Sequence, residues 1–244
     1  MTTLDTVGAI TRSVRDAIAL HGVLVARTVD VDVRPIAAWC FAVPHTVLLE
    51  GLEPAVARTF DDALATLSAA GARIERIELP ELGELATLNA TGGIAPAEAW
   101  FLHRTRLATD EARYDPRIVQ RIRRGEAMTP AEYAELLAGR ARWIAAMERA
   151  LEPFDALLSP TMPMVAPPIA AVRDDDAAFF AVNALLLRNT AIVNMLDGCA
   201  ISIPCQGPGA LPVGLMLWHG SLRDGRVLGA ALAAETALAA AAAG

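Results

Sequence analysis

The stretch LLLRNTAIVNMLDGCAISIPCQGPGALPVGLMLW, Leu185–Trp218, carries the strongest indication of how this chain folds. Its first part has apolar residues at helical spacing and ends at Asp197 and Gly198. Two short β-rich runs follow, at 200–205 and 213–218, with a loop of glycines and prolines between them. Continuous apolar runs bounded by glycine and proline favour strands buried on both faces, so we expect a helix followed by two buried strands.

Six polar side chains interrupt the apolar residues of this stretch and of the residues just before it. They are Asn183, Arg188, Asn189, Thr190, Asn194 and Asp197. Polar groups beside a buried sheet need a hydrogen-bond partner or a ligand. Two interpretations stay open: these side chains tie down the helix end, or they line a pocket.

Length and composition place the chain among globular proteins. Its 244 residues allow one α/β domain or two small ones, and a composition of 54% hydrophobic and 20% charged residues excludes a disordered chain. The net charge of −7 argues against a nucleic-acid or anionic-membrane partner, and no apolar run is expected to span a bilayer. The three cysteines lack C-x-x-C spacing, which indicates neither a disulfide framework nor a zinc site and favours a reducing cytoplasm.

The chain contains no lysine, because all 21 of its basic residues are arginine. A guanidinium does not release its proton at neutral pH, so arginine cannot serve as a general base. Catalysis that depends on a lysine is therefore excluded for this chain alone. Serine is scarce as well, and the serines are Ser13, Ser68, Ser159, Ser202 and Ser221.

A β-α-β unit is predicted in the first third of the chain. A short strand at 35–43 precedes the clearest helix, 50–71, which has Pro54 in its first turn and Gly71 at its end. A strand at 73–79 follows, in which isoleucine alternates with charged residues. A helix between two strands argues for parallel pairing, and neither junction carries a glycine-rich phosphate loop.

The middle of the chain, 80–152, is expected to be a mainly helical portion of a single domain that spans 1–244. Thr129 and Glu132 form a capping-box pattern, which starts a helix that runs to about Leu151. Arginines are frequent just before it, at 117, 121, 123 and 124, and such a basic run is typical of a solvated helix face.

Three further elements are predicted from local signals. Thr11 can cap a first helix that begins at Arg12, and Asp224 can cap a last helix through the alanine-rich tail. Phe154–Ser159 is an apolar run of strand length, so we expect a buried strand there.

Searches for nucleophile motifs are negative. The sequence has no G-x-S-x-G, HExxH or S-x-x-K pattern. Cys199 and Cys205 have His219 as a conceivable base, but a free cysteine in an apolar run is usually a core residue. The four histidines lack metal-ligand spacing, so no metal site is predicted.

Several segments resemble the amidase signature family and follow in its order. They are LDTVGAITRSVRDA (4–17), EGLEPAVARTFDDALATLSAAGARIERIELP (50–80), the segment around Tyr133, FDALLSPTMPMVAPPI (154–169) and RNTAIVNMLDGCAISIPCQGPGALPVGLMLWHG (188–220). This resemblance implies an α/β fold, with a mixed, twisted β-sheet flanked by helices. It also implies hydrolysis of an amide bond in a small molecule, without a metal or an organic cofactor.

The resemblance is to the carboxy-terminal half of that family. The family's lysine and its two catalytic serines precede the segment that matches at Leu4, so the resemblance implies no catalytic residue in this chain. Four residues lie in segments that approach the substrate in the family, which makes them pocket candidates: Arg121, Thr190, Asn194 and Asp197. Gly198 and Cys199 stand where the family has a glycine-proline step.

Three hypotheses follow from this resemblance, and we favour the first. The chain is a truncated or half-length amidase that is inactive alone. The second hypothesis is a half-enzyme that works with a partner chain supplying the amino-terminal half. The third is a non-catalytic scaffold or binding domain that kept the cleft wall. A homodimer is also open, because a half sheet has an unpaired edge.

Overall fold

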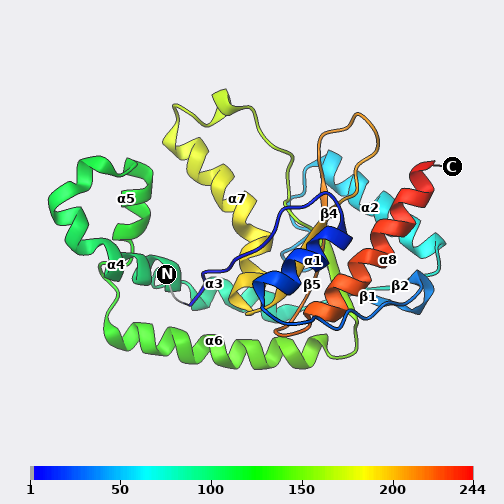
Figure 1. Cartoon of the computed structure of the whole chain (residues 1–244). Coiled ribbons are helices and arrows are strands. Elements are labelled where there is room, and N and C mark those ends of the chain that lie inside the picture. The colour runs from blue at the N-terminus through cyan, green and yellow to red at the C-terminus, as the bar shows by residue number, and fades with distance from the viewer. Residues whose placement is uncertain (1–2, 244) are drawn as a thin grey trace.

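The computed structural model describes residues 3–243, and in them helices cover both faces of one five-stranded sheet (Figure 1). The strands are β1 (Cys40–Pro44), β2 (Arg73–Ile77), β3 (Ala156–Pro160), β4 (Cys199–Pro204) and β5 (Gly214–His219). The α-helices are α1 (Val14–Leu24), α2 (Pro54–Ala69), α3 (Glu84–Leu88), α4 (Ile94–Asp110), α5 (Pro116–Arg123), α6 (Pro130–Leu151), α7 (Asp176–Met195) and α8 (Asp224–Ala243). Short 3-10 helices lie at Ile36–Ala38, Pro80–Gly83, Glu111–Arg113 and Ile169–Ala171.

The sheet is mixed, with the strand order β2-β1-β3-β5-β4. Strand β1 pairs in parallel with both β2 and β3, whereas β5 is antiparallel to both of its neighbours. The predicted β-α-β unit is confirmed, since α2 connects β1 to β2 and Cys40 lies opposite Arg73. The carboxyl ends of β1, β2, β3 and β4 therefore meet at one edge of the sheet.

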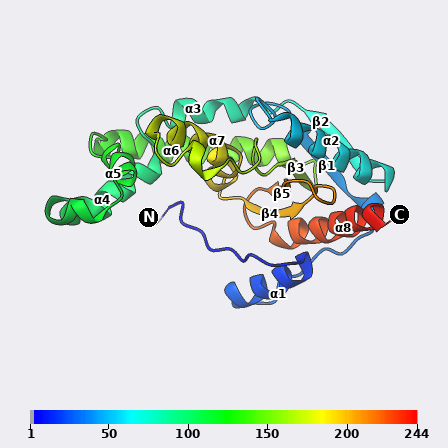
Figure 2. The ribbon, with the colours of Figure 1, turned by 90° about the horizontal axis from the view of Figure 1, so that it is seen from above.

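Each face of the sheet has its own hydrophobic core. On one face, Leu157 and Trp218 pack against Trp143 and Met147 of α6. On the other face, side chains of β1, β3 and β5 pack against α2 and α8, and the core includes Val14 of α1. Figure 2 shows these layers, with α6 and α7 on one side of β4 and β5 and α8 and α1 on the other.

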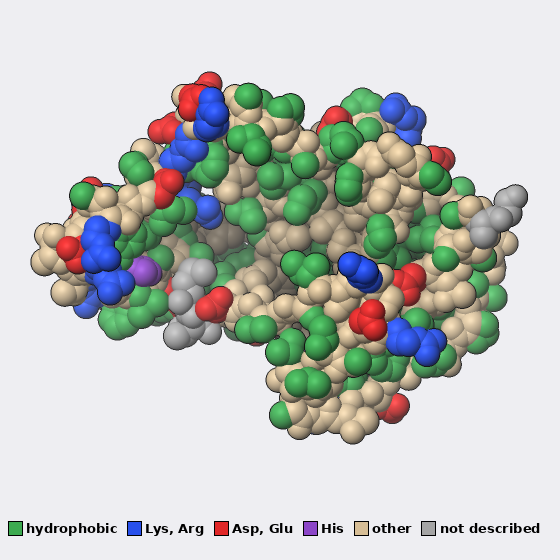
Figure 3. All heavy atoms as spheres, turned by 45° about the horizontal axis from the view of Figure 1, so that its top comes forward, with side chains coloured by type: hydrophobic (Ala, Val, Ile, Leu, Met, Phe, Trp, Pro, Cys, Tyr) green, Lys and Arg blue, Asp and Glu red, His purple; other side chains and the backbone are tan. Residues whose placement is uncertain are grey.

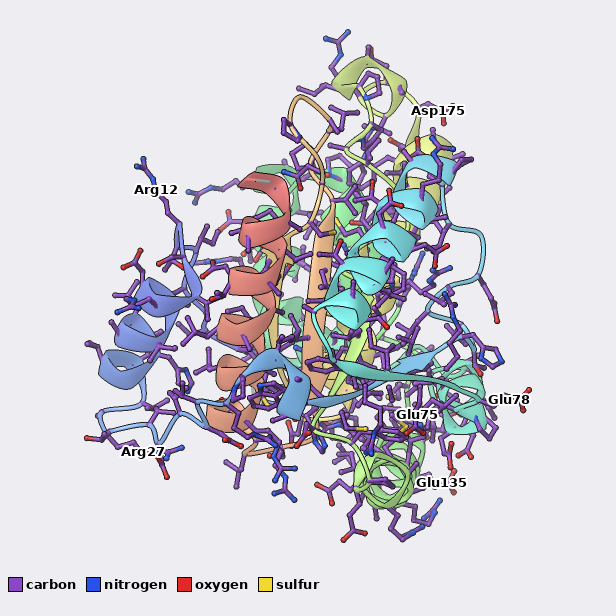
Figure 4. The ribbon with its side chains drawn as sticks, turned by 90° about the vertical axis from the view of Figure 1, so that its right-hand side faces the viewer. Arg12, Arg27, Glu75, Glu78, Glu135 and Asp175 are labelled. Atoms are coloured by element: carbon purple, nitrogen blue, oxygen red, sulfur yellow. The ribbon has the colours of Figure 1, made fainter. Side chains whose placement is uncertain are left out.

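Capping interactions explain where two helices begin. The predicted capping box of α6 is confirmed: Thr129 N donates to Glu132 Oε2 at 2.7 Å, and Glu132 N donates to Thr129 Oγ1 at 3.2 Å. The predicted start of α1 is wrong, because Ser13 rather than Thr11 is its N-cap and the helix begins at Val14. Arg12 lies before the helix and points away from the molecule (Figure 4).

The burial predicted for the two strands of Leu185–Trp218 holds for one of them. Strand β5 is buried along most of its length, as expected. Strand β4 is at the edge of the sheet, and its residues Ala200, Ser202 and Pro204 are exposed. The apolar sequence of β4 therefore belongs to a strand whose outer edge and one face are uncovered by the described residues.

Two helices are long and apolar enough to cross a membrane, judged by length and composition alone: Asp176–Met195 and Asp224–Ala242. The expectation that no apolar segment reaches this length is therefore wrong, because charged residues are sparse enough in both helices to leave a high mean hydropathy. Helix α8 packs against the sheet through Val227, Ala230 and Ala234, in the way of a core helix. Most of α7 is not buried.

Helices α4 and α5 form a lobe at one end of the molecule, which we call the helical lobe (Figure 1). Its small core contains Leu107, Val119 and Ile122. Arg117 of α5 joins the lobe to the start of α7, where its Nε lies 2.6 Å from Asp176 Oδ1. This ion pair links the lobe to α7.

Candidate cleft and second pocket

Residues 5–12, which have no regular secondary structure, face β4 across a cleft, and we call this segment the strap. One end is anchored by Leu4, whose carbonyl oxygen accepts from Asn194 Nδ2 of α7 at 3.0 Å. At the other end, Val14 N donates to Glu235 Oε1 of α8 at 3.0 Å. The strap therefore spans from α7 to α8 while both of its ends are held.

The cleft under the strap, which we call the main cleft, has a volume of about 720 Å³. The strap, α1, the last turns of α7, strand β4 and α8 line it. Its ionisable residues are Arg12, His21, Cys199, Asp224 and Glu235. Figure 3 shows a hollow between the helical lobe and the rest of the molecule, but no residue of the lobe lines the main cleft. The main cleft is therefore bordered by both polar and apolar side chains.

Two of the four pocket candidates, Thr190 and Asn194, line the main cleft. They lie four residues apart on α7, so they share one face of that helix. Thr190 Oγ1 donates to the carbonyl oxygen of Leu187 at 3.3 Å, which leaves its lone pairs available. The amide of Asn194 holds Leu4, so this side chain has a structural contact as well as a position in the cleft.

Asp197, at the carboxyl end of α7, does not line the main cleft. Its φ of 58° is in the left-handed region, which aspartate tolerates better than most residues. Arg140 of α6, which is only 8% exposed, lies with Nη2 3.0 Å from Asp197 Oδ1, and its Nε donates to the Met195 carbonyl oxygen at 2.8 Å. The structure thus places Asp197 at a helix end that a buried arginine stabilises.

Arg121 lies on α5, in the helical lobe, and is half-buried. Within residues 3–243 it has no hydrogen bond or ion pair, and it does not line the main cleft. Its neighbours are engaged: Arg117 pairs with Asp176, and Arg123 pairs with Glu111. The structure therefore does not bring Arg121 together with Thr190 and Asn194 in one pocket.

Cys199 and Cys205, the two cysteines considered as nucleophiles, do not have activated thiols. Burial raises the pKa of Cys199 to about 12 and that of Cys205 to about 11, so both thiols are protonated at neutral pH. His219 lies opposite Cys199 in the β4–β5 ladder, and burial lowers the pKa of its imidazole. Its Nδ1 accepts from Gly220 N at 2.7 Å. Both cysteines are only partly buried and pack against the core that α2 and α8 cover, and Cys199 also lines the main cleft, so the interpretation of the cysteines as core residues holds only in part.

The serines likewise show no nucleophile with a base. No serine hydroxyl in residues 3–243 is hydrogen-bonded to a histidine, and Ser159 Oγ is buried without a partner. Ser13 bonds to Asp16 as a helix cap, and Ser202 bonds to Thr161. Within the same residues, no group of three or more His, Cys, Asp or Glu side chains could hold a metal ion.

The two polar residues just before Thr190, the half-buried Arg188 and the buried Asn189, have structural partners. Asn189 Nδ2 donates to the carbonyl oxygens of Pro160, at 2.8 Å, and Leu48, at 3.2 Å. Arg188 donates to the carbonyl oxygens of Glu50, at 2.7 Å, and Leu48, at 3.2 Å. For these two side chains the interpretation as ties that fix α7 is confirmed.

Sequence reasoning missed a second pocket beside the main cleft, with a volume of about 460 Å³. It lies at the carboxyl ends of β3 and β4, where Thr161 Oγ1 is 2.5 Å from Ser202 Oγ. Ser202 and Pro204 line both pockets, so the two adjoin. The proline-rich loop after Ser159 marked this region in the sequence, but only the fold brings Thr161 and Ser202 together. Neither Arg121 nor Asp197 lines this pocket.

Sequence reasoning also missed Glu98 of α4, which is 8% exposed. Its carboxylate accepts from Thr3 N at 3.2 Å, from the Thr3 hydroxyl, and from the Tyr133 hydroxyl at 3.1 Å. Burial raises the pKa of the Tyr133 phenol, so this hydroxyl stays a donor at neutral pH. This network holds the chain just before Leu4 against the helical lobe and α6.

Curated proteins resemble the chain over most of its length. A 2-amino-5-chloromuconic acid deaminase from Comamonas testosteroni is 29% identical over 237 residues, covering 95% of this chain and 51% of the relative. A glutamyl-tRNA(Gln) amidotransferase subunit from Thermotoga maritima is 27% identical over 269 residues, covering 95% of this chain and 55% of the relative. The chain thus spans about half the length of the curated relatives it matches.

Solved structures also match most of this chain and about half of their own length. A crystal structure of an amidase superposes with a TM-score of 0.79 at 25% identity, covering 94% of this chain and 52% of that one. The crystal structure of the Thermotoga maritima amidotransferase subunit superposes with a TM-score of 0.73 at 27% identity, covering 96% of this chain and 53% of that one. The family model described as Amidase matches residues 1–228. By sequence and by fold, the chain belongs to the amidase family.

Proposed function

We propose that this chain forms one wall of a site that hydrolyses the C–N bond of a small-molecule amide. The catalytic lysine and serines then come from polypeptide outside these 244 residues, either in the same protein or in a partner chain. Membership of the amidase family and the half-length match to its relatives support this proposal. So does the position of Thr190 and Asn194 in the main cleft.

The absence of lysine is the observation that carries the proposal. A serine hydroxyl needs a base to become a nucleophile, and no arginine can accept its proton at neutral pH. The thiols of Cys199 and Cys205 stay protonated, so they do not replace the serine. We therefore expect the chain alone to be inactive, as a carboxy-terminal half would be.

The partner is proposed to cover the free edge of β4. Residues on this edge and on the strap are exposed and apolar, among them Val7, Ile10 and Ala200. Unpaired strand edges and uncovered apolar surface favour association with another polypeptide. One of the relatives is, by its name, a component of a multi-subunit amidotransferase, which is consistent with a partner chain. A cytoplasmic location is proposed on the ground that all three cysteines are free.

Co-expression tests this proposal. The chain is expressed alone and with the remaining, lysine-containing half of a full-length relative, and hydrolysis of simple amides is measured. We expect no hydrolysis and no labelling by a serine-directed phosphonate for the chain alone, and activity for the complex. Stoichiometric labelling of a serine in the isolated chain would overturn the proposal, and an associated but inactive complex would favour the scaffold hypothesis.

A further inference from the structure

The second pocket is bounded by two loops and two helices at the carboxyl edge of the sheet. The loop after β3 contributes Met162 and Met164, and α7 contributes Leu186. Ligands of open α/β sheets commonly bind outside the carboxyl ends of the strands. A volume of about 460 Å³ is in the range of small-molecule sites. The position and the size of the pocket both suit a small organic ligand.

No charged side chain among the described residues lines this pocket. The lining residues are Val56, Thr161, Met162, Met164, Ala166, Pro167, Leu186, Ser202, Pro204, Gln206, Pro212, Val213 and Gly214. The main cleft differs, because Asp224 and Glu235 line it. An ionised ligand group would lose water in the second pocket without gaining a charged partner, which is unfavourable. The lining therefore selects for an uncharged ligand.

The polar side chains of the pocket are the hydroxyls of Thr161 and Ser202 and the amide of Gln206, whose Oε1 already accepts from Val213 N at 3.2 Å. Because the two hydroxyls bond to each other at 2.5 Å, one hydroxyl hydrogen is used between them and the other is free to donate. Both oxygens keep lone pairs, so the pair can donate one hydrogen bond to a ligand and accept another. A carboxamide, with its C=O acceptor and N–H donors, matches this pair.

The backbone keeps this hydroxyl pair in place and accessible. Thr161 N donates to the carbonyl oxygen of Gly214 at 2.8 Å, which fixes Thr161 against the start of β5. A Cβ at Gly214 would collide with both hydroxyl oxygens, at 2.5 Å from Thr161 Oγ1 and closer still to Ser202 Oγ. Glycine is therefore required at 214 for the pair to take this position.

We propose that the second pocket binds an uncharged amide that carries an apolar chain. The carboxamide bonds to the Thr161–Ser202 pair, and the apolar chain lies along Met162, Met164 and Leu186. Ser202 and Pro204 border both pockets, so a ligand of the second pocket lies beside the main cleft. That this ligand is a substrate rests on the proposed function. The inference adds a substrate class: neutral amides with an aliphatic chain, in preference to amides of dicarboxylic acids.

The test measures binding to the chain itself, so it needs no catalysis. Hexanamide, hexanoate and hexylammonium are titrated at pH 7 with ligand-observed NMR. We expect hexanamide to bind and both ions to bind at least about tenfold more weakly, because each ion would be desolvated without a partner. Thr161→Val with Ser202→Ala should weaken hexanamide binding about fivefold, the effect of one or two lost hydrogen bonds.

Two further variants keep the test decisive. Gly214→Ala should weaken hexanamide binding at least as much, since its methyl group displaces both hydroxyls, and it serves if the double variant does not fold. Thr236→Val, which removes an exposed hydroxyl on α8, is the matched control and should bind hexanamide as the original chain does. Melting curves establish that each variant is folded.

The outcomes separate this inference from the proposed function. Equal binding of hexanoate and hexanamide, or unchanged hexanamide binding in folded double and Gly214→Ala variants, would overturn the inference even if the co-expressed complex hydrolyses amides. Selective hexanamide binding that the variants abolish would support the inference, and it would stand if that complex proved inactive.

Discussion

Arg140 and Asp197 are a pair of residues with separable roles. Arg140 is buried and donates to the last turn of α7, whereas the side chain of Asp197 is 58% exposed. We expect Arg140→Met to lower the free energy of unfolding by about 2 kcal/mol, since a hydrogen bond to a charged group is lost. Asp197→Asn keeps the left-handed conformation accessible and should cost less than about 1 kcal/mol, as for other exposed ion pairs. Urea unfolding measures both, and equal losses would contradict these roles.

His219 should make the stability depend on pH in the acidic range. Its side chain is 4% exposed, and burial, with the charge of Arg223, lowers the pKa of the imidazole below the ordinary 6.5. A lowered folded-state pKa gives a contribution that is present above the unfolded value and is lost as pH falls below it. We therefore expect the free energy of unfolding to fall from about pH 6.5 downwards.

The matched variants for this pH effect are His219→Asn and Thr236→Asn. Asparagine can accept from Gly220 N without titrating, so the His219 variant should show a shallower fall in stability with acid. Thr236 is exposed and has no titratable group, so its variant should keep the slope of the original chain. Urea unfolding at several pH values gives both slopes, and an unchanged slope in His219→Asn would refute the assignment.

Thr190 and Asn194 allow a test of the main cleft in the co-expressed complex. We expect Thr190→Val to change turnover or substrate affinity while the melting temperature stays within a degree or two of the original, because only a weak bond within α7 is lost. Asn194→Ala should change the kinetics and also lower the melting temperature, since the lost hydrogen bond to Leu4 costs about 1 kcal/mol. Steady-state kinetics beside melting curves measure these effects. Changes confined to melting would make both residues structural.

At the scale of single residues, the sequence could indicate positions but not contacts. The apolar pattern correctly predicted a helix here, and the spacing of Thr190 and Asn194 places both side chains on one face of it. The pairing of Thr161 with Ser202 joins segments 41 residues apart, and no local pattern encodes it. The contact between Arg140 and the end of α7 is also not encoded locally, since it joins residues 55 positions apart.

Strand β4 and helix α7 both have uncovered apolar surface beside the main cleft. Residues 176–187 of α7 include no buried residue, although most of them are apolar. An apolar helix surface is normally covered by other elements. The two elements border the main cleft, so the surface that a partner would cover is continuous with the candidate site.

A charge on the free edge of β4 should prevent pairing there. We expect Ala200→Arg to reduce self-association of the chain and to block association with the co-expressed half, because charged side chains disfavour edge pairing. Ala65→Arg, at an exposed position of α2, is the control and should leave both unchanged. Size-exclusion chromatography measures association, and normal assembly of the Ala200 variant would show that β4 is not the contact.

Element types were predictable wherever local signals decided them. The proline and glycine that bound α2, the capping box of α6 and the apolar run of β3 all gave the right element. Burial of β4 was not predictable, because it depends on whether another element lies beside the strand. The start of α1 was misplaced for a similar reason, since Glu235 of α8 contributes to its capping.

For the whole molecule, the uncovered surface predicts instability in isolation. We expect the chain alone to bind a hydrophobic dye and to self-associate, and the co-expressed complex to bind less dye and to melt at a higher temperature. Dye fluorescence, light scattering and calorimetry measure these properties. A monodisperse monomer that melts cooperatively and binds no dye would contradict this expectation and favour an independent scaffold domain.

If the proposed amino-terminal half is a separate polypeptide that pairs with β4, the strap would constrain the order of assembly. Because Asn194 holds one end and Glu235 stabilises the other, an incoming strand would have to pass beneath a closed bridge or wait until an anchor opens. Mixing two separately folded polypeptides should then be slow, at a rate set by local unfolding of the strap. Halves that emerge from the ribosome together would meet before the bridge closes, so synthesis as neighbours would be a kinetic advantage.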